Sequence, residues 1–501
     1  MFKLTCLVPS RRLPSQSTGS RWLMRSLAAT LIPWFVVTSV QAAGKSEGSR
    51  LLAQWLKQAG ADKSQVAVDI RSLKDGRPFL SVQPDMPLNP ASSIKLLTTY
   101  AGLLQLGPDY TWKTAFHLDG SLTDGVLDGD LVMVGGGDPK LVIEDLEVII
   151  GQLRARGLTT IAGDLRLNNA LYARPLEPRD AIDGLLTEPY NVWPDAAMLN
   201  FKSTKFVVTP GRRGAQLELD PPLAGVRLEN RISQVKGKCR HRASGLKIRE
   251  RAGKTGAVIR VGGRFSARCG QSEAFHAVLN HVTFSDALFR AAWTAAGGTW
   301  KGKAVRERRS LSQITEQTGG PWYVWQSPRP MAQIITDINK FSNNVMTRQL
   351  MLQLAAENQE ERVDEASGRR LVEAILRLNG LGLQGLVLDN GSGLSRQARI
   401  SARGLTDVLL HASRGPHADT FRESLPIVGV DGTMRRQLRS HPIAGHAWIK
   451  TGSLAGVRSM AGYVAAQSGA EYVVSLIVNG PGARASYTVQ NQLLQWLFKN
   501  G

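Results

Sequence analysis

The stretch Asn89-Pro90-Ala91-Ser92-Ser93-Ile94-Lys95-Leu96-Leu97-Thr98-Thr99-Tyr100 decides the fold, because it predicts a buried helix that carries reactive side chains. Pro90 favours a helix start directly after it, and the apolar residues that follow predict a helix from Ser92 to about Gln105. Ser92 would lie in the first turn, where free N–H groups favour an oxyanion. Lys95, three residues later on the same face, is a candidate base for the Ser92 hydroxyl, since burial lowers the pKa of a lysine.

Ser-x-x-Lys alone is a weak signal, and the chain repeats it twice within residues 233–247. Two further motifs follow Ser92 in order: Ser342-Asn343-Asn344, which is the only Ser-x-Asn in the chain, and Lys450-Thr451-Gly452. A second Lys-Thr-Gly begins at Lys254, but no Ser-x-Asn precedes it. Together the three motifs form the set typical of penicillin-binding proteins and serine β-lactamases.

After its first 42 residues, almost the whole chain resembles one family, the low-molecular-mass class C penicillin-binding proteins, specifically the penicillin-binding protein 4 type of D-alanyl-D-alanine carboxypeptidase/endopeptidase. The resemblance implies an α/β (α+β) penicillin-binding transpeptidase/β-lactamase-like domain, with two largely β inserted domains between the first and second motifs. It implies no cofactor, and the eight histidines form no cluster that predicts a metal site. Outside the three motifs, the resemblance is carried by Leu106-Gly107-Pro108-Asp109-Tyr110, Gly137-Asp138-Pro139, Gly391-Ser392-Gly393-Leu394-Ser395-Arg396, Gly429-Val430-Asp431-Gly432-Thr433 and Ser453-Leu454.

The same resemblance implies a role for each motif residue. Ser92 would attack the carbonyl of the penultimate D-alanine to form an acyl-enzyme, with Lys95 as its base. Ser342 would relay a proton to the leaving D-alanine, Asn344 would hold the substrate amide, and Lys450 would support the relay. An N-cap of the following helix is the alternative role for Ser342.

Substrate binding involves further residues by the same resemblance. Backbone N–H groups of Ser92 and Ser453 would form the oxyanion hole, beside Thr451 and Gly452. Arg396 would contact the peptide side chain, and Asp183 is the candidate acidic partner from the second domain. The expected ligands are peptidoglycan stem peptides and β-lactam antibiotics.

The N-terminus predicts export. Basic residues up to Arg25 precede an apolar run from Leu27 to Val40, and Val40 and Ala42 are the small residues expected before a cleavage site. A membrane anchor is the alternative, but the run is short and Pro33 interrupts it. We therefore expect a signal peptide over 1–42 and a periplasmic protein. The remaining limits are 43–118 for the N-terminal part of the catalytic domain, 119–310 for the inserted domains and 311–501 for the C-terminal part.

Charge and cysteine content describe the insertion. Residues 203–310 hold 22 Lys and Arg against 7 Asp and Glu, which carries most of the formal net charge of +21. In an exported protein this balance indicates an anionic wall polymer or membrane surface rather than nucleic acid, or a solvated basic face without a partner. Cys6 would leave with the signal peptide, so Cys239 and Cys269 are expected to form a disulfide.

Three competing interpretations share some of these features. A serine β-lactamase has the same motifs, but the sequence lacks a Glu-x-x-Leu-Asn pattern and carries the long insertion. A non-catalytic peptidoglycan-binding protein would need no intact motifs. A Ser-His-Asp hydrolase is disfavoured, because the Gly-x-Ser-x-Gly match at residues 44–48 has no preceding strand. Within the insertion, residues 126–134 predict a hairpin that turns at Asp128-Gly129.

Overall fold

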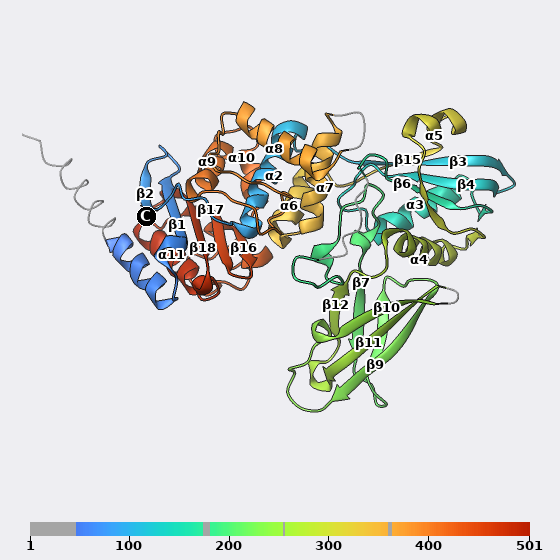
Figure 1. Ribbon diagram of the computed structural model, residues 1–501, viewed down its shortest axis with the longest axis horizontal. Helices are drawn as coiled ribbons and strands as arrows, with labels where there is room; N and C mark the ends of the chain where they lie inside the picture. Colours follow the sequence, from blue (N-terminus) through green and yellow to red (C-terminus); the bar gives the residue numbers. More distant parts are fainter. Residues whose placement is uncertain (1–46, 174–180, 254–255, 359–362) are drawn as a thin grey trace, which may run out of the picture. The chain divides into compact units, whose positions relative to one another are not determined.

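The computed structural model describes residues 47–173, 181–253, 256–358 and 363–501. The predicted signal peptide, residues 1–42, lies outside the described residues. A five-stranded antiparallel sheet, in the order β16–β17–β18–β1–β2, brings together the two ends of this described chain. Figure 1 shows its early strands in blue beside its late strands in red. The strands are β1 (Val66–Ser72), β2 (Pro78–Val82), β16 (Ala447–Leu454), β17 (Val457–Ala465) and β18 (Glu471–Asn479).

Helices cover both faces of this sheet. In β18, Val473 and Ile477 pack on the side of α2, whereas Val474 and Leu476 pack on the side of α11. Alternate strand residues point to opposite faces, so a strand that is buried on both sides reads as a continuous apolar run. The helices on the first side are α2 (Lys95–Leu106), α6 (Met331–Phe341), α7 (Asn344–Ala356), α8 (Glu365–Leu378) and α9 (Ala402–Ala412). On the second side lie α11 (Tyr487–Asn500) and a helix over residues 47–58.

A second, seven-stranded sheet follows α2. Its core lies against α3 (Ile143–Ala155) and α4 (His281–Ala295). The strands are β3 (Lys113–Thr123), β4 (Val126–Val134), β5 (Thr160–Ile161), β6 (Leu165–Asn168), β13 (Thr299–Trp300), β14 (Ala304–Glu307) and β15 (Tyr323–Gln326). The predicted hairpin within 126–134 is wrong, because β4 is one continuous strand and the turn lies at Asp124-Gly125. Gly129 instead faces Gly120 across the ladder, where a Cβ on Gly120 would lie 2.3 Å from the Asp128 carbonyl oxygen.

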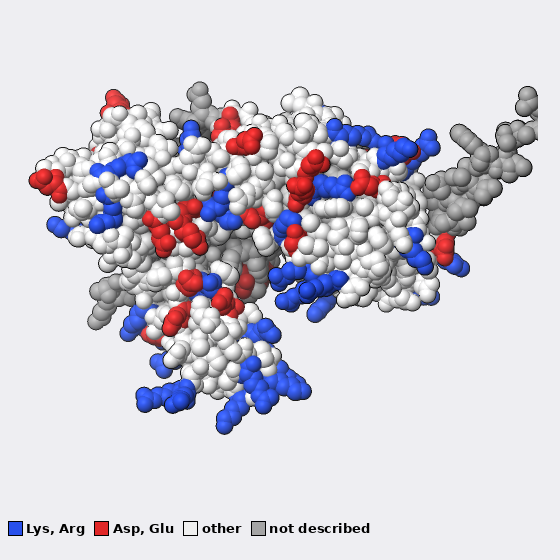
Figure 2. All heavy atoms as spheres, turned by 180° about the vertical axis from the view of Figure 1, so that it is seen from behind, with Lys and Arg blue, Asp and Glu red and all other residues white. Residues whose placement is uncertain are grey.

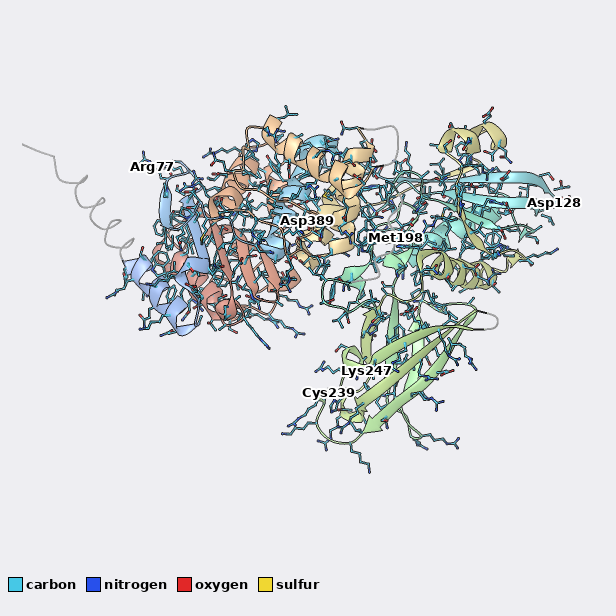
Figure 3. The ribbon with its side chains drawn as sticks, viewed as in Figure 1. Arg77, Asp128, Met198, Cys239, Lys247 and Asp389 are labelled. Carbon is cyan, nitrogen blue, oxygen red and sulfur yellow. A yellow bond between two sulfur atoms is a disulfide. The ribbon has the colours of Figure 1, made fainter. Side chains whose placement is uncertain are left out.

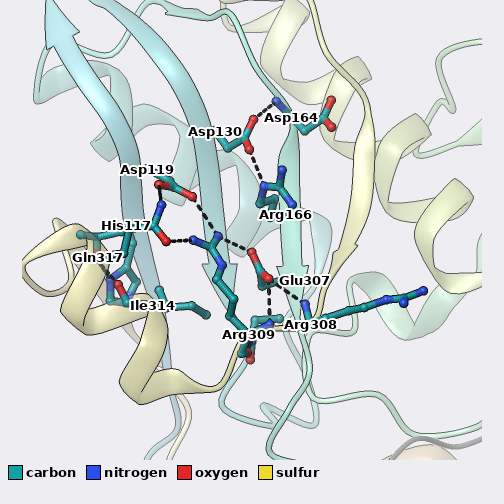
Figure 4. Close-up of polar contacts among 12 residues, drawn as sticks. His117, Asp119, Asp130, Asp164, Arg166, Glu307, Arg308, Arg309, Ile314 and Gln317 are labelled. Atoms are coloured by element: carbon teal, nitrogen blue, oxygen red, sulfur yellow. Dashed lines mark hydrogen bonds and ion pairs between the residues drawn. The ribbon is translucent and has the colours of Figure 1, made fainter.

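Strand pairing supports wider limits for the insertion. The sequence places residues 311–326 in the catalytic part, but β15 pairs with the start of β3, with Tyr323 opposite Phe116. Polar contacts hold α5 (Leu311–Thr318) to the same sheet: Gln317 Nε2 donates to Asp119 Oδ1 at 2.9 Å, and Arg309 forms an ion pair with Asp119 at 2.9 Å (Figure 4). We therefore propose 113 and 326 as the limits of the insertion in place of 119 and 310.

The basic part of the insertion, residues 204–276, forms two small sheets, shown in green in Figure 1. We call this part the basic module. One sheet has the order β12–β7–β8 and the other the order β10–β11–β9. Cys239 and Cys269 form a disulfide in this module, with their Cα atoms 4.8 Å apart, which confirms the predicted pairing. Figure 3 labels Cys239 and Lys247 at neighbouring places there. The strands are β7 (Thr204–Thr209), β8 (Gln216–Asp220), β9 (Val226–Val235), β10 (Lys247–Gly253), β11 (Gly256–Ser266) and β12 (Ser272–His276).

None of the helices in the described ranges is both long and apolar enough to cross a membrane.

Candidate active site

Ser92 lies in a 3₁₀ turn, Ala91–Ile94, that leads directly into α2. The sequence predicted a regular α-helix from Ser92, so the helix is correct in place but its first turn is tighter. The turn is held from outside the helix: the Asn89 side chain accepts from the Ala91 N–H at 2.9 Å, and the Ser93 hydroxyl lies 2.8 Å from that of Ser459 on β17. Ser92 is half-buried, and its hydroxyl is the one that faces Lys95.

Lys95 is fully buried, and its Nζ has three oxygen neighbours among the described residues. Ser92 Oγ lies at 3.1 Å, Asn344 Oδ1 at 2.6 Å, and the Ser392 carbonyl oxygen is in close contact. None of the three is a carboxylate, so no negative charge compensates an ammonium there. Burial, and then the positive charge of Lys450, holds the pKa of Lys95 well below its usual value.

Neutral Lys95 fits these neighbours. A neutral amine has two N–H groups and one lone pair. Asn344 Oδ1 and the Ser392 carbonyl can only accept, so they take the two N–H groups. The lone pair then faces the Ser92 hydroxyl, which is the arrangement a general base needs.

Ser342 ends α6 in the left-handed conformation, with φ 57° and ψ 38°. The alternative role as an N-cap is wrong, because the Asn343 side chain caps α7 by accepting from the Met346 N–H. The sharp turn presents the Ser342 hydroxyl to Lys450 Nζ at 2.9 Å. It also places Asn344 at the first position of α7, where its side chain reaches both Lys95 and the Tyr190 carbonyl oxygen, at 3.3 Å.

Lys450 lies on β16 and is fully buried like Lys95. Its Nζ contacts the Ser342 hydroxyl and donates to the Thr451 carbonyl oxygen at 2.8 Å. Burial lowers the pKa of Lys450 to about 7. Two buried lysines with lowered pKa values therefore belong to the motifs, Lys95 to the first and Lys450 to the third.

Gly452 lets β16 lie directly against the Ser92 turn. A Cβ on Gly452 would lie 2.3 Å from Ser459 Oγ, 2.4 Å from the Pro90 carbonyl oxygen and 2.9 Å from the Ser92 nitrogen. No other residue type fits without moving the strand. The neighbouring hydroxyls are tied locally: that of Thr451 lies 3.1 Å from Thr433 Oγ1, and Ser453 Oγ accepts from Arg458 at 2.6 Å.

Arg396 and Asp183 contact different parts of the chain. Arg396 is exposed and donates to the Ala455 carbonyl oxygen at 2.6 Å, at the turn after β16. Asp183 is also exposed, and it accepts from the Tyr190 hydroxyl at 2.6 Å and from Asn191 Nδ2 at 2.9 Å. Partial burial opposes ionisation of Asp183, but these hydrogen bonds outweigh it and lower the pKa. Through Tyr190, Asp183 is connected to Asn344.

A cavity of about 630 Å³ opens between the start of α7 and the insertion. Ser342 and Asn344 line it on one side, and Glu188 and Tyr190 of the insertion line it on the other. Burial and the charge of Asp183 raise the pKa of Glu188. The cavity is large enough for part of a peptide, and it borders Ser342, whose hydroxyl contacts Lys450.

Sequence reasoning missed three contributors to the site: Tyr190, Ser392 and Thr433. Ser392 and Thr433 lie in glycine-rich stretches that the resemblance had identified, so a signal for them existed. Tyr190 acts through its backbone carbonyl and its bond to Asp183, and nothing in its sequence neighbourhood marks it. Within the described chain, no group of His, Cys, Asp and Glu side chains is arranged to hold a metal ion.

Comparisons with known proteins agree with this geometry. The model of the D-Ala-D-Ala carboxypeptidase 3 (S13) family matches residues 49–500. A D-alanyl-D-alanine carboxypeptidase of Actinomadura sp. (strain R39) is 27% identical over 519 residues, which cover 96% of this chain and 92% of the relative. The D-alanyl-D-alanine carboxypeptidase DacB of Haemophilus influenzae is 25% identical over 417 residues, which cover 81% of this chain and 84% of that protein.

The fold is that of a solved structure. The crystal structure of penicillin binding protein 4 from Haemophilus influenzae superposes with a TM-score of 0.72 at 21% identity, over 89% of this chain and 99% of that one. The match confirms the predicted penicillin-binding, β-lactamase-like fold with its insertion.

Proposed function

Because the chain belongs to the D-Ala-D-Ala carboxypeptidase 3 (S13) family and is a serine DD-peptidase, we propose that Ser92 is its nucleophile and that the motif residues cut peptidoglycan stem peptides. The observation that carries this proposal is the set of contacts of buried Lys95, which leaves a lone pair facing the Ser92 hydroxyl. The reaction removes the terminal D-alanine of a stem peptide or cuts a peptide cross-link.

In the acylation step, the Ser92 oxygen attacks the carbonyl carbon of the penultimate D-alanine while its proton passes to Lys95 Nζ. The C–O bond of the acyl-enzyme forms, and the C–N bond to the leaving residue breaks. The leaving nitrogen takes a proton from the Ser342 hydroxyl, which regains one from Lys450 Nζ, and the proton on Lys95 returns to the Ser92 oxygen when the ester is hydrolysed. Water then hydrolyses the ester and regenerates Ser92.

Oxyanion stabilisation comes from backbone N–H groups of Ser92 and Ser453. The tight approach of β16 at Gly452 supports this proposal, because it sets the strand directly beside the Ser92 turn. One such donor contributes about 3 kcal/mol to transition-state stabilisation in related chemistry. Thr451, which is hydrogen-bonded to Thr433, lies next to Gly452 on β16, the strand along which a substrate backbone would align.

Asp183 and Arg396 are the proposed contacts for the substrate beyond the scissile bond. Asp183 is ionised and exposed, and its fixed geometry with Tyr190 and Asn191 suits an ammonium group on the peptide side chain. Arg396 stands near the end of β16 and suits a carboxylate.

β-Lactam antibiotics acylate the same serine in this proposal. A solved relative of similar fold, penicillin binding protein 4 from Haemophilus influenzae, has been crystallised with a β-lactam. Among the described residues, the partners of Lys95 include no carboxylate that could activate water. The penicilloyl ester should therefore persist, unlike that of a β-lactamase.

A periplasmic location and an anionic wall or membrane partner complete the proposal. The signal peptide that the sequence predicts over residues 1–42 and the disulfide between Cys239 and Cys269 both support an oxidising compartment. The basic module supports an anionic partner, which is argued in the next subsection.

Mass spectrometry after addition of penicillin tests the nucleophile. We expect a stoichiometric, long-lived adduct on the peptide that contains Ser92, and release of D-alanine from a stem pentapeptide. Ser92→Ala should abolish both. Ser93→Ala is the matched control, since the Ser93 hydroxyl lies near Ser459 and not Lys95, and it should keep the adduct. Rapid drug hydrolysis without an adduct would contradict the proposal.

A further inference from the structure

One face of the β10–β11–β9 sheet packs against the hydrophobic core of the insertion, and the other face carries Lys and Arg side chains. In β11, Ile259, Val261 and Phe265 point into the core. The alternate residues of all three strands point outward, and the register places Lys247, Gly262 and Arg231 in one row across the sheet. Arg249, Arg260 and Glu229 form the next row. Residues 226–268 hold 13 Lys and Arg but only 2 Asp and Glu.

Acidic partners compensate only some of these cations. Glu229 lies beneath three arginines and forms ion pairs with Arg227, Arg251 and Arg260 at 2.8–3.3 Å. The other outward cations of the sheet are Arg231, Lys247, Arg249 and Arg264. All four are exposed, and none has an ion pair or side-chain hydrogen bond with another described residue. We call these four residues the basic face.

Gly262 forms an open floor within the basic face. A Cβ on Gly262 would meet nothing closer than 3.6 Å, so the space above it is free. Lys247 and Arg231 are its neighbours across the sheet, and Arg264 follows two residues later on the same side of β11. Neighbouring strands are about 4.8 Å apart, so Lys247 and Arg231, which lie on either side of β11, are about 10 Å apart at Cβ, and Arg264 is diagonal to both. Their long side chains can converge above Gly262 on one anionic group.

A pocket of about 410 Å³ continues the basic face at one end. Arg240 and Arg242 line it together with Lys247 and Arg264 of the face. The segment that carries Arg240 and Arg242 is fixed by the disulfide at Cys239 and by two hydrogen bonds at His241: its carbonyl oxygen accepts from the Ser266 N–H, and its N–H donates to the Ser266 hydroxyl. The two arginines are therefore attached to a fixed backbone beside the sheet, so the cations are positioned before any ligand binds.

The chemistry of the face favours an anionic polymer over a lipid bilayer. Of the large apolar side chains that are exposed in the described chain, none lies within residues 226–268, so the face has nothing to insert into acyl chains. In Figure 2 this module is at the bottom of the view. Lys and Arg gather over the lower part of the module, and Asp and Glu lie nearer its top. Arginine binds carboxylates through paired N–H groups, and five of the six cations of the face and pocket are arginines.

We propose that the basic face and its pocket bind the peptidoglycan strand through the free carboxylates of its stem peptides. The inference rests on the proposed function, because a DD-peptidase acts on peptides that end in a carboxylate before and after cleavage. The face thereby holds the polymer while successive peptides reach Ser92, which raises their effective concentration at the active site. Binding does not require a functional nucleophile.

Sedimentation with purified sacculi tests the face separately from catalysis. The protein is first acylated with penicillin, so that retention does not depend on the active site. We expect Arg231→Glu/Lys247→Glu/Arg264→Glu to weaken binding by at least about tenfold and to flatten its salt dependence. The milder Arg231→Gln/Lys247→Gln/Arg264→Gln should bind sacculi more weakly than the wild type and more tightly than the charge-reversal variant. Its unfolding temperature should match that of the wild type.

A matched control carries three reversals elsewhere: Arg370→Glu/Arg377→Glu/Arg436→Glu, all exposed in the catalytic part. It should bind sacculi like the wild type, and sacculi with amidated carboxylates should retain neither protein. D-Alanine release from a soluble pentapeptide should be the same in the wild type and in the face variants. If no protein, wild type included, released D-alanine, the proposed function would be refuted, but the role of the basic face in binding would not. Equal binding by face and control variants would overturn the inference. So would binding to vesicles of anionic phospholipid with none to sacculi.

Discussion

Asn344 Oδ1 accepts a hydrogen bond from Lys95 Nζ at 2.6 Å, although the two residues are 249 positions apart. The contact fixes one N–H of the buried amine, and the Ser392 carbonyl fixes the other. Without these acceptors the amine could rotate and direct an N–H at the Ser92 hydroxyl. The second motif therefore orients the proposed base of the first motif.

Acylation by penicillin should depend on a deprotonated lysine at neutral pH. Burial and the charge of Lys450 lower the pKa of Lys95, so its amine is neutral where an ordinary lysine is charged. We expect the second-order acylation rate to be maintained at neutral pH and to fall in acid as Lys95 gains a proton. Stopped-flow measurement with a fluorescent penicillin gives the profile. Lys95→Arg, always charged, should be inactive throughout, and a rate that rises only near pH 10 would contradict the assignment.

Lys450 should lower the stability of the fold while serving catalysis. Its folded pKa is about 7 against 10.5 unfolded, so between these values the unfolded chain binds more protons. The free energy of unfolding must therefore rise with pH across that window. At neutral pH, Lys450→Met should be more stable than wild type by about 2–4 kcal/mol, a difference that shrinks towards pH 10. Urea titrations at several pH values test this, and a constant difference would exclude the linkage.

Substitution of Gly452 should separate β16 from the Ser92 turn. In Gly452→Ala the added methyl group would overlap Ser459 Oγ and the Pro90 carbonyl oxygen. We expect a loss of at least about tenfold in acylation rate and a destabilisation of about 1–3 kcal/mol. Gly151→Ala is the control: Gly151 is in α3 with nothing within 4 Å of a Cβ, so a gain of about 0.5–1 kcal/mol is expected. Full activity of Gly452→Ala would show that the strand can move freely.

The disulfide should stabilise the basic module without affecting catalysis. The sequence separation of Cys239 and Cys269 is 30, for which the chain-entropy model gives about 3–4 kcal/mol. Cys239→Ser/Cys269→Ser should unfold earlier in a thermal scan but still accept penicillin at Ser92. Thiol titration of denatured, unreduced protein should find neither cysteine free; two titratable thiols in the mature protein would contradict the pairing.

Asp183 should affect peptide recognition more than drug acylation. Asp183→Asn removes the negative charge, keeps one oxygen acceptor for Asn191 Nδ2, and replaces the oxygen that accepts from the Tyr190 hydroxyl with an NH₂ group, from which that hydroxyl can accept. We expect KM for a stem peptide with an amino side chain to rise about tenfold, because a charge-assisted bond is lost. The rate with penicillin, which lacks that amine, should change little. Tyr190→Phe separates charge from positioning: it keeps the carboxylate and should have the smaller effect on KM.

Local pattern was enough to predict the helix at the site, because Pro90 and the apolar spacing after it predicted α2. The tighter turn over Ala91–Ile94 was not predictable, because it is set by Asn89 and by Ser459, which lies 366 residues from Ser93. The false hairpin at Asp128-Gly129 has a similar origin. Asp-Gly favours a turn locally, but pairing with Gly120 keeps the strand straight.

The sequence by itself determined which residues are candidates for the chemistry: two serines, two lysines and an amide in three ordered motifs, and two cysteines that pair. Tertiary structure alone decided how they act. Burial, which depends on the packing of distant helices and strands, sets the pKa values of Lys95 and Lys450. Long-range contacts bring the Ser392 carbonyl to Lys95 and Tyr190 to Asn344, and strand register gathers the cations of the basic face. Such relationships depend on distance in space, which separation along the chain does not encode.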